Sequence, residues 1–147
     1  MEKQAIFHEV EKSFKTIQEV FPNLTMNIVY THEQLDLSMD IPKQPGLDFN
    51  INVNLQNIDE IHISTKYIHC SFFSAKSQYI VDMFYQAVQG LINGNYRIVQ
   101  FHKRGKLYKS LLQCFKDNEW VTANTEFYKM SWPWTKYEKT IIQNKKY

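Results

Sequence analysis

Cysteine, proline and glycine are all scarce in this sequence, with two, four and four residues in a chain of 147. Two cysteines, Cys70 and Cys114, are too few for a disulfide framework, so we expect reduced thiols. No apolar run reaches the length that spans a bilayer. The first residues, Met1-Glu2-Lys3-Gln4, lack the basic start and apolar block of a signal peptide. These absences favour a cytoplasmic protein without a membrane segment.

The length fits one domain that can bury a core without disulfides or metal. The formal net charge of +2 conceals a division between the two halves of the chain. Residues 1–94 hold 6 Lys and Arg against 11 Asp and Glu, giving −5, and residues 95–147 hold 11 against 4, giving +7. Such asymmetry can mark an interaction surface, unless folding interleaves the two halves.

Two segments have the apolar spacing of amphipathic helices. The first runs from about Glu2 to Val20, and Pro22 closes it. The second runs from Ser77, a plausible N-cap, to Gly94, a plausible left-handed C-cap. Their apolar positions are Ile6, Val10, Phe14, Ile17 and Phe21 in the first, and Ile80, Phe84, Ala87, Val88 and Leu91 in the second.

Apolar and polar residues alternate with a period of two in the remaining segments, as in half-buried strands. The expected strands are 24–30, 35–41, 47–55 and 61–73 (with a bulge near Tyr67–Ile68), then 96–101, 107–115 and 120–125. The pattern predicts a single α+β domain in the order α-ββββ-α-βββ. It would be an antiparallel sheet of about seven strands with the helices packed on one face.

Residues 126–147 differ from the rest, because aromatic residues and lysines dominate them. Trp132-Pro133-Trp134 does not fit a central strand. A short helix over Thr135–Gln143 is expected, followed by fraying from Asn144 to Tyr147. This segment would pack on the domain or be partly mobile.

The polar face of the second and third strands is the first candidate site. With Pro42–Gly46 as the hairpin loop, Asp40 faces Asp48, Ser38 faces Asn50, and Asp36 faces Asn52. An acidic, amide-rich face would suit a cationic protein partner. The partner-binding residues would be Asp36, Asp40, Asp48, Asn50 and Asn52, with Glu33 and Glu60 at the rim. An ordinary solvated face is the simpler interpretation, and a divalent cation held by Asp36, Asp40 and Asp48 is the least favoured.

The basic, aromatic C-terminal half is the second candidate. Lysines neutralise phosphates, and flat rings stack on unpaired bases. The residues that would bind single-stranded nucleic acid are Arg97, Lys103, Arg104, Lys106, Trp132 and Trp134. Lys109 would extend the basic cluster. Tryptophans near a chain end more often pack back onto a sheet than stand in solvent. Packing onto the sheet is therefore favoured about twofold over nucleic-acid binding.

Reactive side chains do not form a recognisable catalytic or metal motif. The candidates His62, His69, Cys70, His102 and Cys114 fall in separate strands, without the spacing of a zinc site. Cys70 beside a histidine could form a nucleophile pair, but a small buried thiol beside an exposed polar residue is the safer interpretation. No phosphate-binding glycine loop opens a helix. We therefore expect no catalytic residue, no metal and no cofactor.

The run Gly90-Leu91-Ile92-Asn93-Gly94-Asn95-Tyr96-Arg97, followed by a basic hairpin and a Leu-Leu-Gln strand, resembles a pattern in small bacterial α+β proteins. Some of these are similar to the immunity proteins encoded beside secreted toxins. The resemblance spans about residues 58–115. It implies a non-enzymatic inhibitor that occludes a cognate toxin, with a protein as partner. That is the leading hypothesis for function, and single-stranded nucleic-acid binding is the alternative.

Overall fold

A computed structural model describes residues 3–31 and 36–145, which form an α+β structure with two antiparallel sheets. The elements are α1 (Lys3–Val20), β1 (Asn27–Thr31), β2 (Asp36–Ile41), β3 (Ile51–Gln56), β4 (Glu60–Ser64), β5 (His69–Phe72), α2 (Gln78–Asn93), β6 (Tyr96–Lys103), β7 (Lys106–Lys116), β8 (Glu119–Phe127) and β9 (Glu138–Ile142). The α+β class is confirmed. The single sheet of about seven strands is wrong, because the described residues form one sheet ordered β1-β2-β3-β4-β5 and another ordered β8-β7-β6-β9.

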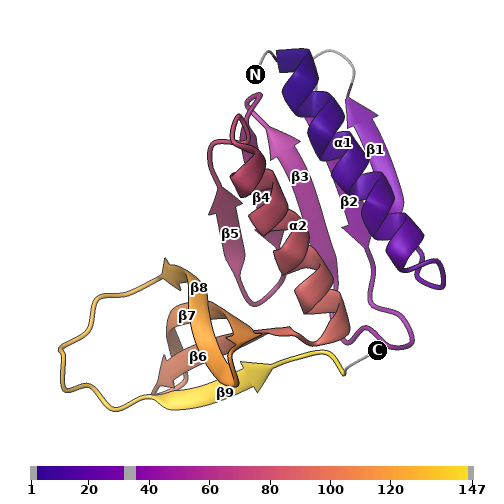
Figure 1. Ribbon diagram of the computed structural model, residues 1–147. Helices are drawn as coiled ribbons and strands as arrows, with labels where there is room; N and C mark the ends of the chain where they lie inside the picture. Colours follow the sequence, from indigo (N-terminus) through magenta and orange to yellow (C-terminus); the bar gives the residue numbers. More distant parts are fainter. Residues whose placement is uncertain (1–2, 32–35, 146–147) are drawn as a thin grey trace.

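The two helices lie side by side over one face of the first sheet (Figure 1). Both helices were predicted, and each buries the apolar stripe that predicted it, except that Ile80 is only partly buried. Phe14 of α1 meets Phe84 of α2 with ring centroids 5.9 Å apart. Gly94 ends α2 with φ of 81°, a left-handed conformation that glycine adopts at little cost. Neither described helix is long and apolar enough to cross a membrane.

The hairpin of β2 and β3 differs from its predicted register by four residues. Asp40 pairs with Asn52, not with Asp48. The connection is longer than Pro42–Gly46 because Leu47 and Phe49 leave the ladder and fill the core, where they are 0% and 2% exposed. A shift by an even number of residues keeps each side chain on its predicted face. The predicted division of the hairpin into an apolar and a polar face is therefore correct, although its register is wrong.

The bulge expected near Tyr67–Ile68 is instead a turn that separates β4 from β5. Thr65 Oγ1 accepts hydrogen bonds from the backbone N–H groups of Tyr67 and Ile68, at 3.0 and 3.1 Å. The turn also joins the two sheets, because the Tyr67 carbonyl accepts from Ser110 Oγ at 2.9 Å and from Gln100 Nε2 at 3.1 Å. The second sheet thus packs against one end of the first sheet and of α2 (Figure 1).

The C-terminal segment contains a strand where a helix was expected. β9 pairs with the free edge of β6, opposing Ile141 to Val99. A nine-residue helix is marginal by itself, whereas Thr140, Ile141 and Ile142 suit a strand. Asn144, predicted to fray, is 2% exposed and anchored by two hydrogen bonds; Tyr147 lies outside the described residues.

Candidate functional site

The second sheet has one covered face and one open face. Tyr96, Ile98 and Leu112 point toward α2 and the first sheet, where Ile98 and Leu112 join the common core. Alternation places Arg97 and Phe101 on the opposite face with Val99. Among residues 3–31 and 36–145, neither helix nor the first sheet packs on this opposite face. Val99 is only 4% exposed there, and most of the side chains around it are half-buried. We call it the basic aromatic face; it consists of Arg97, Phe101, Lys109, Phe115, Trp120, Tyr137 and Lys139.

Arg97 and two aromatic rings occupy the end of this face next to α2. The Arg97 guanidinium lies 4.2 Å from the centroid of the Trp120 ring, which lies 5.1 Å from the Phe115 ring. Arg97 Nε donates to Gln113 Oε1 at 2.9 Å, which fixes the guanidinium in place. Partial burial lowers the pKa of Arg97, but from a starting value so high that the side chain stays charged at neutral pH.

A second group of rings and cations occupies the other end. Lys109 Nζ lies 4.6 Å from the Phe101 ring centroid and 5.7 Å from that of Tyr137. Lys139 Nζ lies 5.4 Å from the Phe101 centroid. The Phe101 and Tyr137 rings meet edge to face at 5.8 Å. Each ammonium therefore lies beside a ring face, the arrangement that attracts cations to aromatic side chains.

The carboxylates of the second sheet lie away from the basic aromatic face. Glu126 points to the first sheet, where it accepts from the His69 backbone N–H at 2.8 Å and from Tyr128 OH. Glu138 pairs with His102 on the covered side. Asp117 lies in the turn between β7 and β8, and Glu119 follows it on the covered side. The face therefore carries positive charge without an acidic residue between the cations.

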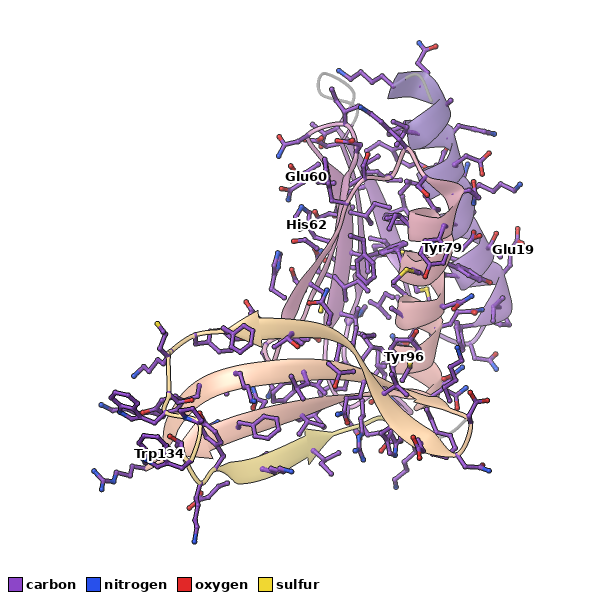
Figure 2. The ribbon with its side chains drawn as sticks, turned by 60° about the vertical axis from the view of Figure 1, so that its left-hand side comes forward. Glu19, Glu60, His62, Tyr79, Tyr96 and Trp134 are labelled. Atoms are coloured by element: carbon purple, nitrogen blue, oxygen red, sulfur yellow. The ribbon has the colours of Figure 1, made fainter. Side chains whose placement is uncertain are left out.

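The basic hairpin and the two tryptophans meet at the end of this sheet that lies away from α2. Lys103, Arg104 and Lys106 form the β6–β7 turn, and residues 128–137 connect β8 to β9 across the same end. Trp132 and Trp134 stack on each other at 5.5 Å and are 70% and 76% exposed. Figure 2 shows Trp134 at this end and Tyr96 at the other. The expectation that the tryptophans pack back onto the sheet is wrong.

The nucleic-acid candidates predicted from the sequence are thus brought to one sheet, although Arg97 lies at the opposite end from the other five. Sequence reasoning named Arg97 and Lys109 but missed the rings of Phe101 and Trp120 beside them, and it missed Lys139. The alternation that put Arg97 on one side also put Phe101 there, so this signal was available. The contribution of Lys139 was hidden, because its position depends on β9 pairing with β6.

The predicted acidic surface is only partly assembled. Asp36, Asp40 and Asn52 lie on the polar face of the first sheet, with Glu60 near one end of it. Asn52 Nδ2 donates to Asp40 Oδ1 at 2.5 Å. Asp48 and Asn50 lie outside the strands, in the connection before β3, and Asn50 accepts from the Lys43 backbone N–H. Glu33 lies outside the described residues.

Within the described part of the chain, two buried side-chain atoms on that polar face have no hydrogen-bond partner. They are Asn54 Oδ1 and His62 Nε2; the latter lies 3.5 Å from Glu60 Oε2. The His62 and His69 rings stack at 5.1 Å. Figure 2 shows Glu60 and His62 pointing away from the helices, so they lie on the face of the sheet that neither helix covers.

The structure does not assemble the metal and nucleophile candidates. Within residues 3–31 and 36–145, no three metal-binding side chains come together, and Asp48 is separated from Asp36 and Asp40. Cys70 and Cys114 are both free thiols. Burial raises the pKa of the Cys70 thiol to about 12, with a smaller contribution from Glu126. Cys70 therefore lacks the thiolate that a nucleophile needs.

Comparisons of the chain with protein-family models, with curated proteins and with solved structures find no match.

Proposed function

We propose that this protein binds single-stranded nucleic acid on the basic aromatic face. One observation supports the proposal above others: rings and cations share an open sheet face that contains no carboxylate. Cations neutralise the phosphates of a bound strand and release its counterions. Exposed rings stack on bases, which contributes about 1–3 kcal/mol per base.

The arrangement favours a single strand over a duplex. A ring on a sheet can stack only on a base whose own neighbour has moved away, which is common in single strands and rare in duplexes. The Arg97–Trp120 pair and the Lys109–Phe101 pair stand four residues apart along β6, or about 13 Å. A strand that crosses the face would meet a ring and a cation at each end.

The separation of acidic and basic residues into two halves of the chain supports binding of nucleic acid at the same surface. The acidic half, residues 1–94, forms both helices and the first sheet, and the basic half forms the second sheet. The fold therefore keeps the two halves apart and does not interleave them. Asp36, Asp40 and Glu60 on the first sheet would repel phosphates and direct an approaching strand to the second sheet.

A salt titration tests the proposal with a fluorescein-labelled oligothymidylate. Affinity should fall steeply between about 50 and 200 mM salt. Lys139→Glu should weaken binding and reduce the slope by about 0.7 for each phosphate that is no longer neutralised. Lys43→Glu is the matched control, because Lys43 is exposed and lies on the acidic half. Absence of binding at low salt, or equal effects of the two substitutions, would refute the proposal.

A second candidate is the immunity-type inhibitor, acting through the polar face of the first sheet. The observation that favours it is that Asn54 Oδ1 and His62 Nε2 are buried on this face without a hydrogen bond among the described residues. A docked protein could supply their missing hydrogen bonds. The test is co-purification with the product of the adjacent gene, followed by charge reversal of Asp36 and Asp40. Unchanged binding after both reversals would exclude this face.

A further inference from the structure

A cavity opens beside the basic aromatic face, where the chain leaves β8 and returns toward β9. Its volume is about 390 Å³. Four rings and two lysines line most of it: Tyr108, Phe127, Tyr128, Tyr137, Lys109 and Lys129. The basic hairpin of β6 and β7 lies at the same end of the sheet.

The walls of the cavity are held by contacts within the chain. The Tyr108 and Tyr137 rings meet edge to face at 5.6 Å, and Tyr137 OH donates to Ser131 Oγ. The backbone N–H of Tyr128 donates to the Tyr108 carbonyl at 2.8 Å. Burial and a hydrogen bond to Glu126 raise the pKa of Tyr128 to about 12, so its hydroxyl stays neutral. The cavity is thus formed before any ligand arrives.

We propose that this cavity holds one unstacked nucleobase of the bound strand, an inference that rests on the proposed function. Flat aromatic walls suit a planar heterocycle, which needs stacking surface more than charge. The negative charge of a nucleotide is on its phosphate, and the two lysines at the cavity supply cations that neutralise it. No carboxylate is among the residues that line the cavity.

Lys109 connects the cavity to the rest of the proposed path. Its ammonium lies between Phe101, on the sheet face, and Tyr137, at the cavity. A phosphate bound there would join a base stacked on Phe101 to the base inside the cavity. The cavity is therefore a continuation of the basic aromatic face and gives it one position where a base would be partly enclosed.

Substitution of Tyr137 tests the role of the ring. Tyr137→Ala should lower the affinity for oligothymidylate roughly tenfold, the effect of removing one stacked base. Tyr137→Phe keeps the ring and should retain most of the affinity. The salt slope should stay unchanged in both, because no cation is removed. Tyr79→Ala is the control, since Tyr79 is 70% exposed on α2 and should not affect binding.

Photo-crosslinking of oligonucleotides with one 5-bromouracil locates the base even if Tyr137→Ala does not fold. Crosslinks to Tyr108, Phe127 or Tyr137 support the inference. Crosslinks confined to Phe115 and Trp120, or equal affinity of Tyr137→Ala and the unchanged chain, overturn it while the proposed function stands. No oligonucleotide binding overturns both. Binding of anionic phosphatidylglycerol vesicles in place of oligonucleotides would assign the exposed loop to a lipid surface and would also overturn the inference.

Discussion

Asn144 attaches the C-terminal strand to the body of the protein, and its removal should be strongly destabilising. Its Oδ1 accepts from the Asp48 backbone N–H at 2.8 Å, and its Nδ2 donates to the Leu91 carbonyl at 2.8 Å. Leu91 lies in the last turn of α2, whose final carbonyls have no partner within the helix. One side chain thus holds a loop of the first sheet and caps a helix.

The expected cost of Asn144→Ala follows from the two groups it leaves behind. The Leu91 carbonyl is buried and would be left without this partner, which costs about 1–3 kcal/mol. Asp48 is exposed, so its N–H can turn to water, and that change costs about 0.5–1.5 kcal/mol. Together the substitution should cost about 3 kcal/mol. In a chain of this length, that destabilisation should lower the melting temperature by about 6–12 °C.

Urea unfolding followed by circular dichroism measures this cost, with two neighbouring substitutions as a graded control. Gln143→Ala removes only the bond from Nε2 to the Gly94 carbonyl and should cost about 1 kcal/mol. Lys145→Ala removes an exposed side chain and should lie within about 0.5 kcal/mol of the unchanged protein. If Asn144→Ala were no more destabilising than Lys145→Ala, the anchoring role would be refuted.

Three further predictions concern the core and its titration. Gly90→Ala places a Cβ 2.0 Å from Tyr96 Cδ1, so it should destabilise by about 1–3 kcal/mol in urea unfolding, and by less in a Tyr96→Ala background. Burial raises the pKa values of Tyr96 and Tyr128 to about 12. Because the fold favours the neutral phenols, stability should be full below about pH 10 and fall toward pH 12, and a spectrophotometric phenol titration should show late-ionising tyrosines. Iodoacetamide at mildly alkaline pH should alkylate Cys114 before Cys70, which is 1% exposed; rapid labelling of Cys70 in mass spectra of the folded protein would contradict this.

Local sequence patterns predicted where the helices and strands lie more successfully than they predicted which strands pair with each other. The stripe through Ile6, Val10 and Phe14 fixes the buried side of α1 in any arrangement, because helical spacing is a property of the segment alone. Three strands of the second sheet, β6, β7 and β8, were also found nearly in place. Whether β6 extends the first sheet or begins another depends on pairing between distant segments. No pattern within a strand encodes that choice.

β9 shows how a short segment can be misassigned. Residues 135–143 are compatible with a helix or a strand by periodicity, as short segments often are. The free edge of β6 decides between them, since it offers unpaired backbone groups to the returning chain. The β-branched residues Thr140, Ile141 and Ile142 were the available local signal for a strand.

The candidate site depends on this same pairing, which explains why the sequence revealed it incompletely. The segment that carries Tyr137 and Lys139 reaches Phe101 only because β9 aligns with β6. A helix at 135–143 would have broken that alignment and left Phe101 beside Lys109 but without Tyr137 and Lys139. The basic aromatic face is therefore a product of the sheet's closure by its last strand, and removal of the Asn144 anchor should weaken nucleic-acid binding as well as stability. A variant at Asn144 that unfolds more readily yet binds oligothymidylate with unchanged affinity below its melting temperature would show that β9 does not complete the face.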